Sequence, residues 1–181
     1  MSAPDPVPEF ARPVRIDALG EGARPMTVEA DAGERAALAA RFGLVALDRL
    51  AAEAVLTRKG DMILAEGRVT ARLTQACVAS GAPVPAEIDE PFSLRFVPAV
   101  ASGGDMAGEE MELDIEDVDT VEYAGGAIDL GEAVAETMAL CLDPFPRARD
   151  ADAVLREAGV LSEEEAAEAA SPFAALKGKI T

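Results

Sequence analysis

Residues 44–77 read LVALDRLAAEAVLTRKGDMILAEGRVTARLTQAC, and this segment gives the clearest indication of the fold. Small or apolar residues alternate there with polar ones, namely Gly67, Val69, Ala71 and Leu73 against Glu66, Arg68, Thr70, Arg72 and Thr74. A period of two is typical of a strand with one buried and one solvated face. Together with the charged turn Arg58-Lys59-Gly60-Asp61, it predicts a long hairpin with strands over 44–57 and 62–77. Gly67 has no side chain to pack, which predicts a bulge or a close backbone approach there.

Shorter alternating runs predict further strands. Phe92, Leu94 and Phe96 share one face of a strand over 88–97, after a break at Gly81, Pro83 and Pro85. Three more strands are expected over 10–16, 25–30 and 121–123.

Two segments predict capped amphipathic helices, over 31–42 and 129–142. Each begins at an aspartate followed three residues later by a glutamate, Asp31 with Glu34 and Asp129 with Glu132. Pro144 ends the second helix, since the residue before a proline is pushed out of the helical region. Short helices are also expected over 152–158 and 162–170.

The expected fold class is α+β, a curved antiparallel sheet or partly closed barrel with packed helices and a helical C-terminal tail. The first helix should close one end of the sheet, and the second should pack on it. We expect one domain over residues 1–147, with a mobile acidic loop at 101–119, and an acidic helical tail over 148–181.

Composition argues against most catalytic centres. The chain of 181 residues has no histidine and two cysteines, Cys77 and Cys141, so it can form neither a Ser-His-Asp triad nor a zinc site that needs histidine or four thiolate ligands. The acidic run from Asp114 to Asp119 lacks the glycine and glutamate of an EF-hand loop. No phosphate-binding glycine loop is present. We therefore expect no enzyme activity, no cofactor, no metal and no small-molecule substrate.

Charge is divided unevenly along the chain. Residues 1–102 hold 14 acids and 11 bases, whereas residues 103–181 hold 20 acids and 5 bases. The back half should repel nucleic acid and attract a basic protein, although solubility alone is an alternative reason for the charge. Neither a signal peptide nor an apolar span is visible, which predicts a cytoplasmic protein without membrane contact.

Three surfaces are candidates for contacts with partners. The first is a basic stripe for RNA or another partner, made of Arg58, Lys59, Arg68, Arg72 and Arg95, and the alternative is a solvated face whose arginines pair with acids such as Glu53 and Glu66. The second is an acidic set for a basic protein, made of Glu109, Glu110, Glu112, Asp114, Glu116, Asp117 and Asp119. The third is an apolar tail with Pro172, Phe173 and Leu176, which could dock on the chain's own core or on a partner.

The order of the C-terminal motifs resembles that of a known family. IDLGEAVAETMALCLDPFPR at 128–147, followed by SPFAALKGKI at 171–180, is similar to the YceD-like family, the large ribosomal RNA subunit accumulation proteins. The likeness covers roughly residues 44–180. It implies a role in accumulation or processing of 23S ribosomal RNA and in large-subunit assembly. It also implies a large-subunit ribosomal protein or a pre-ribosomal particle as partner, with 23S RNA as a further possibility.

One departure from the family pattern concerns cysteine. Many relatives have C-x-x-C where this chain has Cys77 and Ser80, and further cysteines where residues 147–150 have none. A metal site is therefore not carried over, and Cys77 is interpreted as a small buried hydrophobe. The leading hypothesis is a non-enzymatic assembly factor. The alternatives are an RNA-binding module that acts through the arginines and a metal-dependent hydrolase that uses the acidic run.

Overall fold

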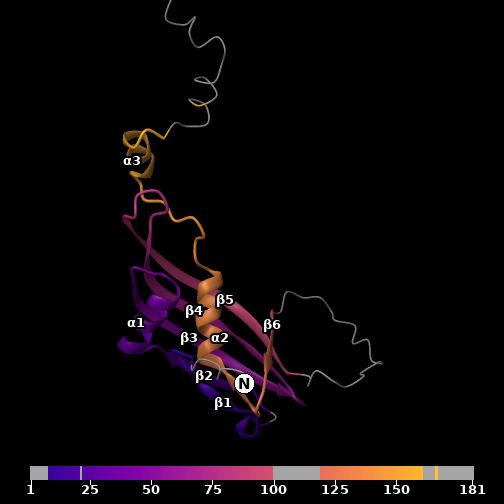
Figure 1. Cartoon of the computed structure of the whole chain (residues 1–181). Coiled ribbons are helices and arrows are strands. Elements are labelled where there is room, and N and C mark those ends of the chain that lie inside the picture. The colour runs from indigo at the N-terminus through magenta and orange to yellow at the C-terminus, as the bar shows by residue number, and fades with distance from the viewer. Residues whose placement is uncertain (1–7, 21, 100–118, 161–165, 167–181) are drawn as a thin grey trace, which may run out of the picture. The chain divides into compact units, whose positions relative to one another are not determined.

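The structure is a computed structural model that describes residues 8–20, 22–99, 119–160 and 166. Figure 1 shows the elements along the chain. In order they are β1 (Pro13–Arg15), η1 (Ile16–Ala18), β2 (Arg24–Glu29), α1 (Ala32–Arg41), β3 (Ala46–Lys59), β4 (Met62–Ala76), β5 (Pro83–Pro98), β6 (Asp119–Tyr123), β7 (Ala127–Asp129), α2 (Leu130–Leu140) and α3 (Ala151–Glu157). The chain has the mixed α+β composition that the sequence predicts.

The predicted hairpin is the centre of a five-stranded sheet ordered β2-β3-β4-β5-β6. Strands β3 and β4 pair antiparallel from Lys59 opposite Met62 to Ala46 opposite Thr74. The neighbouring pair β2-β3 is also antiparallel, but β6 runs parallel to β5. The expectation of a wholly antiparallel sheet is therefore wrong at this edge. The reason is topological. The start of β6 pairs with Leu94 of β5, and the connection between the two strands is long enough for the crossover that parallel strands need.

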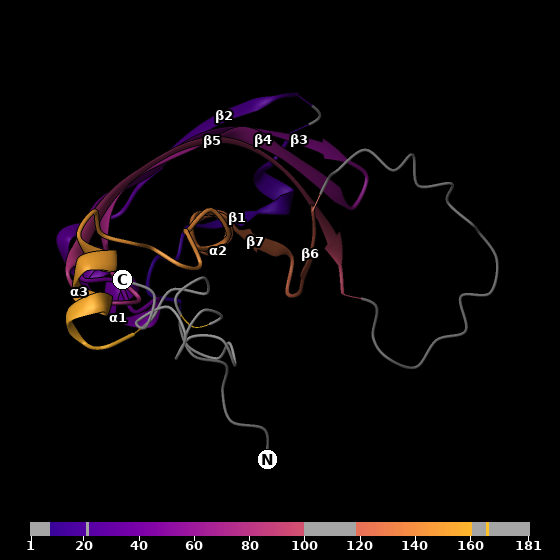
Figure 2. The same cartoon turned by 90° about the horizontal axis from the view of Figure 1, so that it is seen from above.

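The sheet is curved, as predicted. Seen from above, β2 to β5 form an arched layer, and α2 with the β1-β7 pair lies on its concave side (Figure 2). Within the described residues β2 and β6 are the two edges of the sheet and do not pair with each other. The partly closed barrel that was the alternative is thus not confirmed.

The buried core lies on the concave side of this sheet. The alternation predicted for β4 is confirmed, because Val69 and Leu73 are buried whereas Arg68 and Arg72 are exposed. Helix α2 contributes six buried residues, and α1 packs on β3 and buries Leu38. Gly67 marks the close backbone approach that the sequence suggests, since an added Cβ would lie 2.2 Å from the carbonyl oxygen of Glu53.

The predicted helix caps are also confirmed. The Asp31 side chain accepts the backbone N–H of Glu34, and the Glu34 carboxylate accepts the N–H of Asp31, which completes a capping box. The Asp129 carboxylate accepts the N–H of Glu132 at 3.0 Å. Each helix begins within one residue of its expected start.

Strand boundaries differ from the prediction by three or more residues at two strands. Strand β5 begins at Pro83 rather than near 88, and Pro85 does not interrupt it. The parallel partner β6 joins only from Leu94, so the earlier part of β5 is an edge where a missing N–H is tolerated. The strand expected over 10–16 is shorter, because only Pro13–Arg15 pairs, with β7, before a 3-10 turn.

The N-terminal segment is anchored at the start of α2. Phe10 is fully buried in the core, and the N–H of Arg12 donates to Asp129 Oδ1 at 2.8 Å. Gly131 leaves room for this segment, because an added Cβ would lie 1.9 Å from the carbonyl oxygen of Phe10. The glycine in IDLGEAV thus has a packing role.

The chain divides into two compact units. One comprises residues 1–74 and 85–143 and contains the main hydrophobic cluster of the described residues. The other comprises residues 75–84 and 144–181, and its described part holds α3 and the turn between β4 and β5. In this unit the N–H of Val78 donates to the carbonyl of Pro146 at 2.9 Å. The domain boundary predicted at residue 147 stays a prediction.

Candidate interaction surfaces

The convex face of the sheet carries most of the predicted basic residues. Arg68 and Arg72 both point outward from β4, with side chains 54% and 63% exposed. Arg68 pairs with Asp89 at 2.7 Å, and Arg72 reaches Glu87 at 3.3 Å through Nε. The two acids lie on β5, not at Glu53 or Glu66 as the solvated-face interpretation suggested. Ion pairs as exposed as these contribute little to stability.

Arg58 does not join that face. It lies opposite Ile63 on the concave side, where its guanidinium donates to the carbonyl of Gly60 at 2.7 Å and to that of Ile16 at 3.1 Å. It lines an open cleft of about 600 Å³ with Tyr123, whose hydroxyl donates to the carbonyl of Asp61. Its guanidinium therefore has a structural role at the end of the hairpin.

The outward positions of β2 to β5 are balanced in charge. Strand alternation places five cations there, Arg49, Lys59, Arg68, Arg72 and Arg95, and five carboxylates, Glu29, Glu53, Glu66, Glu87 and Asp89. The structure thus places four of the five predicted basic residues on the same face of the sheet, but not as a uniformly basic stripe. Any affinity for an anion must come from a local arrangement.

Arg49 is the outward cation that the sequence reasoning missed. A register shift between Leu47 and Arg49 places Arg49, instead of Asp48, opposite Arg72. The sequence does contain a signal for this irregularity. Leu47 and Leu50 are three residues apart and both are buried, which a regular strand of period two cannot achieve.

The acidic set and the apolar tail fall mostly outside the described residues. Of the acidic set only Asp119 is described, exposed at the start of β6 and opposite Leu94 of β5. The other six acids, the remainder of the predicted loop at 101–119, the helix at 162–170 and the tail residues Pro172, Phe173 and Leu176 lie outside the described part of the chain. These surfaces stay predictions.

Cys77 is buried, as expected, but it is more than a hydrophobe. Its Sγ accepts the N–H of Ala148 at 3.3 Å, and this bond, with further donors from Ser80 and Ala79, lowers the pKa of the thiol to about 7. Hydrogen bonds to sulfur favour the thiolate because they stabilise its negative charge. Cys141 is exposed, and partial desolvation of its sulfur raises the pKa of that thiol.

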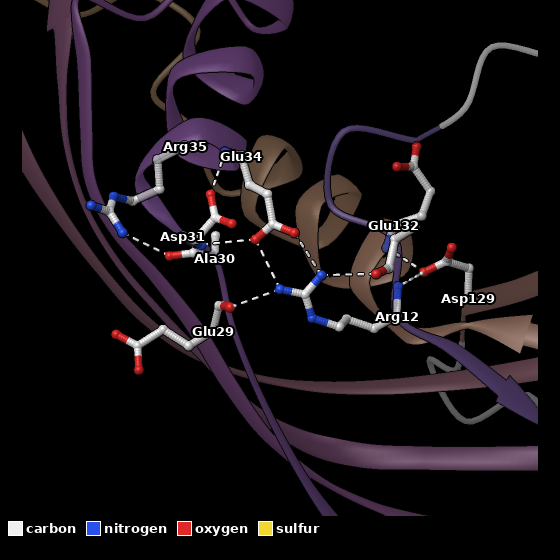
Figure 3. Close-up of polar contacts among 9 residues, drawn as sticks. Arg12, Glu29, Ala30, Asp31, Glu34, Arg35, Asp129 and Glu132 are labelled. Carbon is white, nitrogen blue, oxygen red and sulfur yellow. Dashed lines mark hydrogen bonds and ion pairs between the residues drawn. The ribbon is translucent and has the colours of Figure 1, made fainter.

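A network of ion pairs joins the N-terminal segment to both helices. The Arg12 guanidinium binds both oxygens of Glu34, at 2.7 and 2.8 Å, and also donates to the carbonyl of Glu29 (Figure 3). Arg41 similarly pairs with Glu9 and Glu132. The hydrogen bonds from Arg12 hold the pKa of Glu34 below its usual value. This network fixes the N-terminal segment onto the core.

Replacing Glu34 by glutamine is expected to lower the free energy of unfolding by about 1 kcal/mol at pH 7, because glutamine keeps the helix cap but loses the ion pair. A lowered carboxylate pKa stabilises the fold above about pH 4.5, and this contribution is lost as the pH falls through the lowered value. Urea unfolding at pH 7 and pH 3 should therefore show a difference from wild type that shrinks at pH 3. Glu66→Gln, at an exposed glutamate without an ion pair among the described contacts, should show neither effect. An unchanged difference at pH 3 would contradict this assignment.

Metal-binding groups and membrane-spanning helices are two further features considered for the described ranges. No three histidine, cysteine, aspartate or glutamate side chains within those ranges are grouped to hold a metal ion. No helix in the same ranges is long and apolar enough to cross a membrane.

Comparison with known proteins identifies one relationship. The family model described as "Large ribosomal RNA subunit accumulation protein YceD" matches residues 65–178, which is more than half of the chain. Searches among curated proteins and among solved structures found no match. The matched range begins in β4 and contains the motifs at 128–147 and at 171–178.

Proposed function

Because the chain belongs to the YceD family, we propose that it is a non-enzymatic factor that acts in the cytoplasm to promote accumulation of 23S ribosomal RNA during large-subunit assembly. The family match carries this proposal. The lack of histidine in the sequence supports a role in binding rather than in acid-base catalysis. The proposed partner is a large-subunit ribosomal protein or a pre-ribosomal particle.

The acidic segment is the proposed contact for that partner. Residues 100–118 hold seven acids and no base, and they connect the end of β5 to the start of β6. Asp119 and Glu122 of β6 are exposed and extend the same charge onto the sheet. Opposite charges speed the encounter of two proteins and favour a basic partner over an acidic one.

Neutralising this segment tests the proposal. Seven substitutions by the matching amides, at Asp105, Glu109, Glu110, Glu112, Asp114, Glu116 and Asp117, keep the length of the β5-β6 connection and leave Asp119 in its strand. The variant should bind pre-ribosomal particles at least tenfold more weakly and fail to restore 23S RNA levels in cells that lack the protein. The measurements are co-sedimentation with large-subunit precursors and quantification of 23S RNA.

A control variant separates the effect of this segment on particle binding from the effect of total charge. Seven acids outside it are replaced by amides in a second variant, at Asp150, Asp152, Glu157, Glu163, Glu164, Glu165 and Glu168. This control should retain most of the particle binding. Equal loss in both variants would show that net charge alone matters, and no loss in either would contradict the proposed contact.

Direct RNA binding is the second candidate function. The observation that favours it is the exposure of Arg68, Arg72 and Arg49 on one sheet face. Binding through arginine and phosphate weakens steeply with salt, so a shallow salt dependence of particle binding would count against it.

A further inference from the structure

We propose that Arg49 and Arg72 form a phosphate-binding site on the convex face of the sheet, and that its ligand is a backbone phosphate of RNA. The choice of RNA rests on the proposed function in ribosomal RNA accumulation. The site itself rests on the geometry of β3, β4 and β5.

The first observation is the pairing of two cations. Arg49 and Arg72 are directly opposite each other on antiparallel strands, on the same face and both exposed. Like charges in this position repel each other, and their Cα atoms are only about 5 Å apart in such pairs. A regular register would have placed Asp48 opposite Arg72, where opposite charges attract each other. The bulge replaces that attraction with a repulsion, which a bound anion would relieve.

The second observation is unused hydrogen-bonding capacity. Arg49 makes no hydrogen bond or ion pair in the described part of the chain, so all five of its N–H donors are open. Within the described ranges Arg72 uses only Nε, for the 3.3 Å contact with Glu87, which leaves both terminal nitrogens without a partner there. Guanidinium groups bind phosphate oxygens in a bidentate manner, and two of them facing one hollow suit a phosphate.

The third observation is a hollow between them. A depression of about 300 Å³ is lined by Arg49, Thr70, Ala71, Arg72, Glu87, Ile88 and Asp89. Thr70 lies between the two arginine-bearing positions, and among the described residues its hydroxyl makes only a 3.4 Å contact with the carbonyl of Ala51. That bond is weak enough for the hydroxyl to turn toward a ligand. A phosphate group fits in this space.

Two acidic residues, Glu87 and Asp89, line the same hollow and affect how tightly it can bind an anion. Asp89 is engaged by Arg68 at 2.7 Å, so its charge is already compensated. Glu87 competes with an anion for Arg72, and its removal should strengthen binding. The outward positions of β3 and β4 carry no aromatic residue on which a base could stack, so the site is suited to phosphate and not to base recognition.

Titration of the full chain tests the proposal. Arginine Nε–H signals are followed by NMR while inorganic phosphate, and separately a hexauridine RNA, is added. The signals of Arg49 and Arg72 should shift and saturate with both probes. Arg49→Gln should weaken binding of the RNA by about tenfold, the effect of losing a charge-assisted hydrogen-bonding group. Glu87→Gln should tighten it.

Arg24→Gln is the matched control, because Arg24 is an exposed arginine whose only described side-chain contact is the carbonyl of Ala18. Its effect on RNA affinity should stay within twofold. Loss of one phosphate contact should also reduce the slope of log affinity against log salt by about 0.7 for single-stranded RNA, in Arg49→Gln but not in Arg24→Gln. Urea unfolding confirms that both variants are folded.

Three results would overturn the site. They are shifts that do not saturate, equal weakening by Arg24→Gln, and tighter binding of an acidic peptide such as hexaglutamate than of the RNA. The first two indicate a general ionic effect, and the third indicates a protein ligand. The site can fail while the acidic-segment variants still lose particle binding, in which case the proposed function stands without it.

Discussion

Replacing Gly131 by alanine is expected to destabilise the protein by about 3 kcal/mol, at the upper end of the usual cost of overpacking. The added Cβ would lie 1.9 Å from the carbonyl oxygen of Phe10 and 3.0 Å from the backbone nitrogen of Arg12. Both are backbone atoms, so no side-chain rotation relieves the clash, and the N-terminal segment must move away from α2. In an unhindered helix the same change would instead stabilise by about 1 kcal/mol. Urea unfolding followed by circular dichroism measures the loss.

Gly20→Ala is the control for this substitution. Gly20 has no atom within 4 Å of an added Cβ, and its backbone does not require a positive φ. Its free energy of unfolding should stay within about 0.5 kcal/mol of wild type. A Gly131→Ala protein as stable as this control would show that residues 10–12 do not pack on α2 as described.

Truncating Phe10 to alanine should cost about 3 to 5 kcal/mol, the range for a fully buried aromatic side chain. Phe10 has no exposed surface, although it stands three residues before the first strand. The guanidinium of Arg12 lies 4.5 Å from the centre of its ring, which adds a cation-π contact that truncation also removes. Thermal unfolding should show a large fall in the midpoint temperature.

Leu140→Ala provides the comparison for Phe10→Ala. The Leu140 residue is 80% exposed near the end of α2, so its truncation removes little buried surface, and alanine favours the helix. The expected change in stability is within about 0.5 kcal/mol. If Phe10→Ala were equally mild, the N-terminal segment would not be part of the core.

The sequence predicted the parts of the fold that depend on local pattern. The β3-β4 hairpin follows from alternation and a charged turn, and the caps at Asp31 and Asp129 follow from the Asp-x-x-Glu spacing. It did not predict the β1-β7 pair, because the paired residues are more than a hundred positions apart. It also did not predict that β6 pairs parallel to β5, because this depends on which edge of the sheet is unpaired. The extension of β5 through Pro85 was also missed, because a proline is tolerated there only where the strand has an unpaired edge.

For the candidate surfaces, too, the sequence predicted some features and missed others. Alternation placed Arg68 and Arg72 on one face, and the structure agrees. Arg58 was assigned to the same group because it lies at the predicted hairpin turn, yet strand parity places it on the other face, opposite Ile63. Arg49 was overlooked because its position depends on a bulge. The spacing of Leu47 and Leu50 was the available signal, but it becomes decisive only once both residues are known to be buried.

The parallel pairing of β5 and β6 has a consequence for how the acidic segment can vary. The segment leaves β5 after Pro98 and reaches β6 at Asp119, so the pairing of the two strands fixes both of its attachment points. The entropy of closing a chain segment between two fixed points grows only with the logarithm of its length, and doubling the number of residues costs about 0.6 kcal/mol. Insertions and deletions between these strands should therefore leave the fold almost unaffected. Selection for binding to the partner can therefore change the number of charges in this segment without opposing selection for folding.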